Sequence, residues 1–369
     1  MEEIDNKYME MALQLAARGR GNTSPNPLVG AVLVKGGQVV GSGYHQAAGA
    51  PHAEVVALQE AGPEAAGCTL YVNLEPCCHH GRTPPCVEAI LKAGVQKVVV
   101  AMTDPNPQVN GKGVKFLQDR GIEVKTGVLA GEARQLNEVF IKYVTSGEPF
   151  VLVKTAMSMD GKIATHTGDT RWITGEKARH WVQRLRSEVD GVVVGIETVL
   201  RDDPALTTRL EDDPAARDAA RIIVDSKGRL PLDARIINPT STAPTILAVS
   251  DKASRQHILQ LRDLGVEVWE LPTRQGGICL KSLLKALGEQ QFSYLLVEGG
   301  GTLNYSFLEE NLIDKLCLFV APMVCGGSKA PTPFGGKGVD RLSEAWGIFQ
   351  LKVEEFGGDL LLSGYPRKY

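Results

Sequence analysis

The sequence reads PHAE at residues 51–54 and EPCCHHGRTPPC at residues 75–86, and these stretches decide the fold of its first half. Each opens a predicted helix, and a predicted strand runs between them. Among their residues are His52, Cys77 and Cys86, whose side chains are of the kinds that zinc prefers as ligands. Three protein ligands leave the fourth tetrahedral position open for water, as in catalytic zinc sites. The pattern therefore predicts a catalytic zinc ion.

Glu54 lies two residues after His52, so on the first turn of a helix both side chains can face the same cavity. A carboxylate there can take a proton from the attacking water and deliver it to a departing amine. Helix N-termini also favour thiolates, because the helix dipole lowers the pKa of a cysteine. Together these residues predict a zinc-dependent deaminase with Glu54 as its proton carrier.

Two alternatives stay open at this site. Cys78 could compete with Cys77 for the metal, although Pro76 favours Cys77 by fixing the turn before it. A structural zinc site would close with a fourth protein ligand, which Cys78, His79 or His80 could supply. Nucleobase deaminases usually have two residues between their cysteines. Here the interval is longer, so the loop between the cysteines can reach over a substrate.

The first half alternates between strands and helices around these stretches. Residues 29–35 and 38–44 predict a hairpin that turns at Gly36-Gly37. The other expected elements are strands over 69–75 and 97–102 and helices over 7–18, 53–61, 85–94 and 131–144. This alternation is typical of an α/β sheet with helices packed on its faces.

The pattern resets near Ser146-Gly147-Glu148-Pro149, and a new strand is predicted over 150–158. A chain of 369 residues is too long for one typical core, so we expect two domains, 1–147 and 148–369. The second alternates again. Its expected elements are strands over 191–195, 221–225, 244–250 and 294–301 and helices over 176–189, from 253 and from 302.

The composition excludes several classes of protein. Lys and Arg together number 40 against 43 Asp and Glu, so there is no basic excess for nucleic acid or an anionic membrane. The acidic start and the absence of a long apolar run argue against a secretory signal or a membrane span, so we expect a cytoplasmic protein. The odd number of cysteines disfavours a disulfide framework. Cys279, Cys317 and Cys325 are expected to be small buried side chains.

The sequence closely resembles the bifunctional deaminase–reductase family of riboflavin biosynthesis over nearly its whole length. The resemblance rests on HAE, LEPCCHHGRTPPC, AMTDPNPQVNGKG, KTAMSMDGKIAT, TRWITG, DDPALTTR and VEGGGTLN. It implies an α/β fold, with a cytidine-deaminase-like αβα N-terminal domain and a dihydrofolate-reductase-like C-terminal domain. The implied cofactors are zinc and NADPH. The implied reactions are deamination of a diaminopyrimidinone ribose phosphate and then reduction of its ribosyl group to ribityl. The resemblance also implies a homo-oligomer formed through the reductase domain.

The resemblance assigns substrate contacts in the first half to Asn26, His45, His79 and Arg82. An amide such as that of Asn26 can both donate to and accept from a pyrimidine edge. The simpler interpretations are a turn between two prolines for Asn26 and a solvated side chain for Arg82. In the family the position of Cys78 is commonly serine, which implies that Cys77 is the ligand.

A glycine run, Gly299-Gly300-Gly301, stands between an expected strand and an expected helix in the second half. Unshielded backbone N–H groups at a helix start suit a phosphate, and the alternative is a tight turn that needs glycine's conformational freedom. The resemblance implies NADPH contacts here and elsewhere. They are Ala156, Trp172, Thr198, Asp202, Ser226, Gly300, Gly301, Thr302, Leu303, Asn304, Tyr305 and Ser306. Trp172 could otherwise belong to the core.

The resemblance also implies substrate contacts in the second half, from Thr170, Arg186, Leu206, Arg209 and Glu298. The two arginines suit a ribose phosphate, because a guanidinium group pairs two oxygens at once. The alternative for Arg186 is a solvated helix face. No residue of this half stands out as an acid or base, and Asp202 is expected only to orient polar groups.

Two other functions compete with this interpretation. A deaminase of nucleic acid would need a basic stripe, which the charge balance disfavours. A non-catalytic scaffold stabilised by zinc would be indifferent to the change Glu54→Gln.

Overall fold

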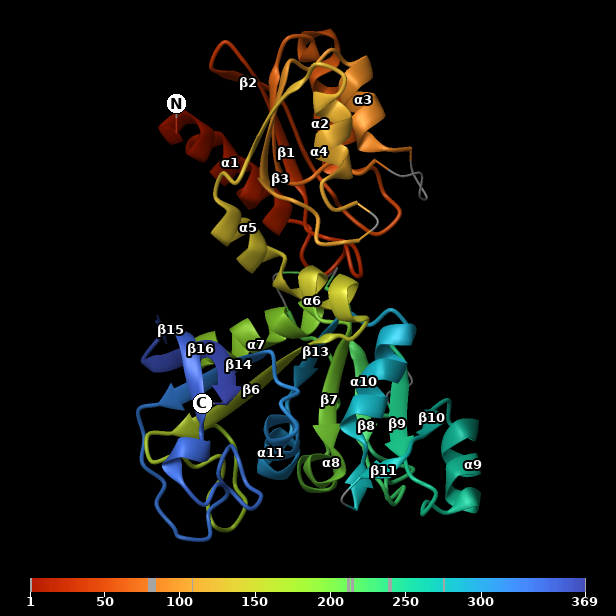
Figure 1. Ribbon diagram of the computed structural model, residues 1–369. Helices are drawn as coiled ribbons and strands as arrows, with labels where there is room; N and C mark the ends of the chain where they lie inside the picture. Colours follow the sequence, from red (N-terminus) through yellow and green to blue (C-terminus); the bar gives the residue numbers. More distant parts are fainter. Residues whose placement is uncertain are drawn as a thin grey trace. The chain divides into compact units, whose positions relative to one another are not determined.

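The computed structural model (Figure 1) describes residues 2–78, 84–107, 109–210, 213, 216–237, 241–274 and 276–368. The chain divides into two compact units, Met1–Gly147 and Glu148–Tyr369. Among the helices of these described ranges, none has the length and apolar character needed to cross a membrane.

The first unit contains a five-stranded sheet in the order β2-β1-β3-β4-β5. Its strands are β1 (Gly30–Lys35), β2 (Gln38–Tyr44), β3 (Thr69–Leu74), β4 (Lys97–Met102) and β5 (Glu123–Thr126). β1 pairs antiparallel with β2 and β3, while β3, β4 and β5 run parallel. β1, β3 and β4 are buried almost without interruption, which indicates that both faces of the sheet are covered.

Helices cover the two faces of this sheet, as the alternation predicts. α1 (Glu2–Ala17) packs on β1 and β3 and contacts α5 (Ala130–Leu136). α2 (Ala53–Ala61) packs on β1 and β2 and is followed by the short helix η1 (Gly62–Ala65). α3 (Cys86–Lys92) contacts α2, and α4 (Lys112–Gln118) contacts α3. Figure 1 shows α2, α3 and α4 together on the face opposite α1. The expected αβα architecture is confirmed.

The prediction of one helix over 131–144 is wrong. The structure has two helices, α5 and α6 (Glu138–Ser146), which are separated at Asn137. The buried Asn137 amide accepts a hydrogen bond from the Leu28 N–H (2.8 Å) and donates one to the Leu28 carbonyl (3.0 Å). These contacts hold Asn137 outside the helical conformation, at φ −103° and ψ 19°. The same two hydrogen bonds fix the backbone of Leu28, which lies two residues after the predicted substrate contact Asn26.

The second unit contains a nine-stranded sheet in the order β10-β9-β8-β7-β13-β6-β14-β16-β15. The strands from β10 to β14 in this order are parallel, and β16 and β15 are antiparallel to their neighbours. They are β6 (Phe150–Ser158), β7 (Gly191–Gly195), β8 (Ala220–Val224), β9 (Thr245–Val249), β10 (Glu267–Glu270), β13 (Tyr294–Val297), β14 (Lys315–Ala321), β15 (Trp346–Phe356) and β16 (Asp359–Lys368). A separate ribbon pairs β11 (Thr273–Arg274) with β12 (Gly277–Ile278).

The crossovers between the parallel strands are mostly helical. They include α7 (Glu176–Glu188), α8 (Ile196–Asp202), α9 (Arg255–Asp263), α10 (Leu280–Glu289) and α11 (Gly301–Glu309), and a short helix η2 (Leu342–Glu344) precedes β15. Cys317 is buried in β14 as predicted, and Cys279 is half-buried. The prediction that Cys325 is buried is wrong, because it lies exposed in the loop after β14.

Candidate functional site

Three predicted zinc ligands meet in the first unit. His52 lies immediately before α2, Cys77 follows β3, and Cys86 is the first residue of α3. His52 Nδ1 lies 3.1 Å from Cys86 Sγ and 3.5 Å from Cys77 Sγ, and all three ligand atoms lie within 4.8 Å of one another. Zinc bonds of about 2.0–2.1 Å to nitrogen and about 2.3 Å to sulfur separate tetrahedral ligands by roughly 3.5 Å. The three residues therefore fit a zinc ion with one position to spare.

Cys77, rather than Cys78, belongs to this group. The backbone N–H of Cys86 donates to Cys77 Sγ at 3.3 Å. Hydrogen bonding from Cys86 lowers the pKa of Cys77 to about 4 against the opposing effect of burial, and His52 acts in the same direction. Burial raises the pKa of Cys78 instead. His79, His80 and Arg82 lie outside the described residues.

Glu54 lies on the first turn of α2 and is only 3% exposed. Burial raises its pKa to about 7, and the charge of Cys77 adds to this effect. A hydrogen bond with Cys86 acts against it, which places the carboxyl group beside the ligand cluster. A carboxyl group with a pKa near neutrality can both accept and release a proton at physiological pH.

His45, a predicted substrate contact, lies beside His52, and Asn26, another, lies beside His45. The His45 ring meets the His52 ring edge-on, with 5.6 Å between their centroids. His45 Nδ1 is 3.2 Å from the Pro51 carbonyl and Nε2 is 3.1 Å from Asn26 Nδ2. Burial lowers the pKa of His45. A neutral ring that donates from Nδ1 and accepts at Nε2 satisfies both contacts. The Asn26 amide then donates to His45 through its nitrogen.

The expected cofactor residues of the second unit follow the carboxyl ends of neighbouring parallel strands. Ala156 is near the end of β6, Thr198 and Asp202 follow β7, Ser226 follows β8, and residues 300–306 follow β13. In open parallel sheets, ligands bind outside the carboxyl ends of the strands. A Cβ atom on Gly300 would lie 3.8 Å from the Thr198 hydroxyl, so segments distant in sequence meet at this edge.

The glycine run does not need positive φ angles, because none of its three residues has one. The alternative based on conformational freedom is therefore wrong. A Cβ atom on Gly301 would lie 2.4 Å from the Thr332 carbonyl, so close packing requires glycine there. Gly300 directly precedes α11, and its N–H and those of the next two residues belong to the first turn.

Three of the expected cofactor contacts on α11 have buried side chains: Leu303, Asn304 and Tyr305. Asn304 donates to the Pro333 carbonyl (2.9 Å) and Tyr305 to the Gly338 carbonyl (3.0 Å). Thr302 is exposed and Ser306 is half-buried. The start of the helix is therefore the part of this segment that a ligand can reach.

Trp172 is 65% exposed, so the alternative that places it in the core is wrong. The Arg179 guanidinium lies 4.6 Å from the centre of its ring. Asp202 ends α8, and its carbonyl accepts from Arg171 at 3.4 Å. Burial raises the pKa of Asp202, and the charges of Arg171 and Arg201 oppose this.

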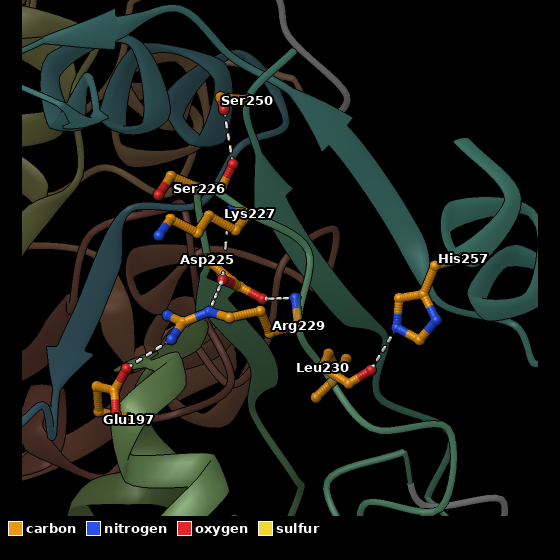
Figure 2. Close-up of polar contacts among 8 residues, drawn as sticks. All are labelled: Glu197, Asp225, Ser226, Lys227, Arg229, Leu230, Ser250 and His257. Atoms are coloured by element: carbon orange, nitrogen blue, oxygen red, sulfur yellow. Dashed lines mark hydrogen bonds and ion pairs between the residues drawn. The ribbon is translucent and has the colours of Figure 1, made fainter. Parts of the chain in front are cut away.

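The loop that carries Ser226 is held by its neighbours, as Figure 2 shows. The Ser226 carbonyl accepts from the Ser250 hydroxyl at 2.6 Å. Asp225 accepts from the N–H and side chain of Arg229, which also pairs with Glu197 at 2.7 Å. In Figure 2 the Ser226 hydroxyl points away from Ser250. The loop is thus fixed by contacts that do not use that hydroxyl.

Arg186 and Glu298 form a buried ion pair. Arg186 Nε and Nη2 donate to the two Glu298 oxygens at 3.1 and 2.5 Å, and the side chains are 12% and 9% exposed. The solvated-face alternative for Arg186 is therefore wrong. Lys154 Nζ lies 4.0 Å from Glu298. Burial alone would raise the pKa of Glu298, but the charges of Arg186 and Lys154 lower it to about 2.

Lys154 was not among the residues predicted from the sequence, although a signal for it was present. A lysine inside the apolar strand FVLVKTAMS has no solvated position if both faces of the strand are covered.

The remaining expected substrate contacts differ in exposure. Thr170 is half-buried, Leu206 is buried, and Arg209 is exposed. The Arg209 backbone N–H donates to the Gln183 side chain at 2.9 Å.

Comparisons with known proteins cover both units. A family model described as the cytidine and deoxycytidylate deaminase zinc-binding region matches residues 2–102, and one described as the RibD C-terminal domain matches residues 149–362. The chain is 45% identical to the riboflavin biosynthesis protein RibD of Aquifex aeolicus over 98% of both chains.

Two solved structures are similar throughout. Acinetobacter baumannii RibD (form 1) is 42% identical, with a TM-score of 0.88 and complete coverage of both chains. The Thermotoga maritima diaminohydroxyphosphoribosylaminopyrimidine deaminase/5-amino-6-(5-phosphoribosylamino)uracil reductase is 35% identical, with a TM-score of 0.86 and 99% coverage of both. The chain therefore belongs to the RibD family, the bifunctional zinc-dependent deaminases and NADPH-dependent reductases of riboflavin biosynthesis.

Proposed function

We propose that residues 1–147 deaminate 2,5-diamino-6-(ribosylamino)pyrimidinone 5′-phosphate and that residues 148–369 reduce the product with NADPH. The activity for which the Thermotoga maritima relative is named supports this choice of substrates. The observation that carries the first half of the proposal is the convergence of His52, Cys77 and Cys86 beside the buried Glu54.

In this proposal His52, Cys77 and Cys86 would hold a zinc ion, which would supply activation of the attacking water when bound. Glu54 would accept a proton from the attacking water and donate it to the amine that leaves the ring. Its pKa of about 7 supports both steps. Asn26 and His45 hold the pyrimidine edge, with His45 fixing the amide of Asn26 so that its carbonyl faces the ring. His79 and Arg82 are proposed as further substrate contacts from their positions in the sequence.

The change Glu54→Gln tests the deaminase assignment. Zinc content, measured by atomic absorption, should stay near one ion per chain, because Glu54 is not a ligand. Ammonia release should fall by at least about a hundredfold, since an amide cannot carry the proton. Deamination at the normal rate would overturn the role of Glu54.

For the reductase we propose that NADPH lies across the carboxyl ends of β6, β7, β8 and β13. The first turn of α11, from Gly300 to Thr302, would bind a cofactor phosphate through its backbone N–H groups. Ser226 would contact the cofactor through its hydroxyl. The rest of the cofactor site would be lined by Ala156, Trp172, Thr198, Asp202 and Ser306. Leu303, Asn304 and Tyr305 have buried side chains, so their contacts would come from the backbone.

The sugar phosphate is proposed to meet Thr170, Leu206, Arg209, Arg186 and Glu298. Arg209 is exposed and offers its whole guanidinium group to the phosphate. Two nitrogens of Arg186 are engaged by Glu298, which leaves Nη1 for a ligand oxygen. Arg209→Ala should cost about 1.5–3 kcal/mol of sugar-phosphate binding and leave the KM for NADPH unchanged. An unchanged KM for the sugar phosphate would place the phosphate elsewhere.

We further propose a homo-oligomer formed through the edge strand β15. Ile348, Phe349, Leu351 and Val353 expose apolar side chains along this strand, and an edge strand also offers unpaired backbone groups. If this is the interface, Val353→Lys should reduce the mass measured by light scattering, whereas Leu259→Lys, at an exposed position on α9, should not. Equal masses for both variants would exclude β15.

We propose a cytoplasmic location. All seven cysteines lie in the described part of the chain and none forms a disulfide, which suits a reducing compartment.

A further inference from the structure

The segment AMTDPNPQVNGKG, residues 101–113, has no role in the proposed function, although the sequence analysis singled it out. It begins at the end of β4 and includes the start of α4. Its residues Asp104, Gly111 and Gly113 contact Glu75 and Pro76, just before Cys77. These contacts bear on the position of Cys77, and the inference drawn from them rests on the proposed role of Cys77 as a zinc ligand.

Glu75 joins the chain just before Cys77 to the chain between β4 and α4. It follows β3 directly, and its side chain is buried, at 3% exposure. One carboxylate oxygen accepts from the N–H groups of Asp104 (3.0 Å) and Gly111 (2.9 Å), and the other accepts from the N–H of Val114 (3.0 Å). Because Gly111 and Val114 lie at the start of α4, Glu75 satisfies amides that the helix itself leaves unpaired.

Gly113 brings the same two segments together through close packing. A Cβ atom on Gly113 would lie 2.1 Å from the Pro76 carbonyl and 3.2 Å from a Glu75 oxygen. The first distance is far below any real Cβ contact, and the atom it meets is backbone, so a side chain at 113 would displace Pro76. The φ angle of Gly113 is not positive, and proximity alone demands glycine.

Cys77 directly follows Glu75 and Pro76, the two residues held by these contacts. Its sulfur lies 3.5 Å from His52 Nδ1 and 3.3 Å from the backbone nitrogen of Cys86, so a small shift of Pro76 would move the sulfur relative to both partners. We propose that Glu75 is a positioning residue for the zinc site: with Gly113, it locks the Glu75-Pro76 backbone so that Cys77 is held at ligand distance from His52 and Cys86.

The test compares Glu75→Gln and Gly113→Ala with wild type in the full chain. Glutamine keeps the size of Glu75 but turns an NH₂ group toward backbone donors. Alanine at 113 pushes on the Pro76 carbonyl. Groups that orient metal ligands typically change metal affinity about 10–100-fold, so the Kd for Zn²⁺, measured against a chromophoric chelator, should rise by that factor in both variants. The visible spectrum of the Co²⁺-substituted protein should change as well.

Two matched controls accompany the variants. Gly131 is also the second residue of a helix, α5, but nothing lies within 4 Å of its hypothetical Cβ atom. Glu64 is an exposed glutamate. Gly131→Ala and Glu64→Gln should keep wild-type Zn²⁺ affinity and the wild-type Co²⁺ spectrum. Measurements are made at a temperature at which circular dichroism shows every variant folded.

The outcomes separate this inference from the proposed function. Wild-type Zn²⁺ affinity and an unchanged Co²⁺ spectrum in Glu75→Gln and Gly113→Ala would overturn the positioning role, even if both variants melt at lower temperature. Insoluble protein from both variants with soluble controls would also reject it, since the contact would then serve folding. If Cys77→Ser keeps full Zn²⁺ affinity, it is the ligand assignment that fails.

Discussion

Replacing Glu298 by glutamine should destabilise the second unit at neutral pH, because it removes the negative charge that Arg186 and Lys154 surround. The Glu298 side chain is 9% exposed, so solvent screens the pair little. Its pKa falls from an ordinary 4.5 to about 2, which corresponds to about 3 kcal/mol of folding free energy. Loss of one partner from a buried ion pair typically costs about 3–5 kcal/mol.

The effect should depend on pH in a defined direction. The pKa of Glu298 is lower in the folded state than in the unfolded state. Its contribution is therefore fully present above the unfolded value and is lost as the pH falls toward about 2. Glutamine does not titrate, so the difference in unfolding free energy between wild type and variant should shrink between about pH 5 and pH 3.

Tryptophan fluorescence during urea denaturation measures this unit separately, because all four tryptophans, Trp172, Trp181, Trp269 and Trp346, lie after residue 148. Glu309→Gln, on an exposed position of α11, serves as the control and should leave the curve unchanged. A loss below about 1 kcal/mol at pH 7, the scale of an exposed pair, would refute the reasoning. So would a difference that stays constant down to pH 3.

Three further predictions follow from the two units. Cys77→Ser should lose zinc and deamination, while Cys78→Ser should retain both; the reverse result, by metal analysis and ammonia release, would exchange their roles. Residues 148–369 expressed alone should oxidise NADPH with the deaminated sugar phosphate and need no zinc, and residues 1–147 should deaminate without NADPH; a folded reductase fragment without activity would contradict this. Asn137→Ala should lower the melting temperature of the first unit through the loss of two partly buried hydrogen bonds, at about 1 kcal/mol each. An unchanged melting temperature would contradict its anchoring role.

The cluster of His52, Cys77 and Cys86 could be predicted because each of these residues lies near the boundary of an element that local sequence defines. His52 directly precedes a helix, Cys77 lies three residues after the end of a strand, and Cys86 is the first residue of the next helix. The alternation of strands and helices places such boundaries at the same edge of a sheet. Residue chemistry together with hydrophobic periodicity was thus sufficient for this cluster and for the αβα layers around it.

The tertiary structure alone decided which distant groups satisfy one another. Arg186 and Glu298 are 112 residues apart and Asn137 and Leu28 are 109 apart, and periodicity carries information only about neighbours within a few turns. For that reason the break between α5 and α6 and the ion pair inside the reductase unit were both missed. The contacts of Glu75 were missed for the same reason, because its carboxylate oxygens accept hydrogen bonds from backbone N–H groups 29 to 39 residues further along the chain. A buried polar group must find partners wherever the fold brings them, and the fold here brings them from other elements.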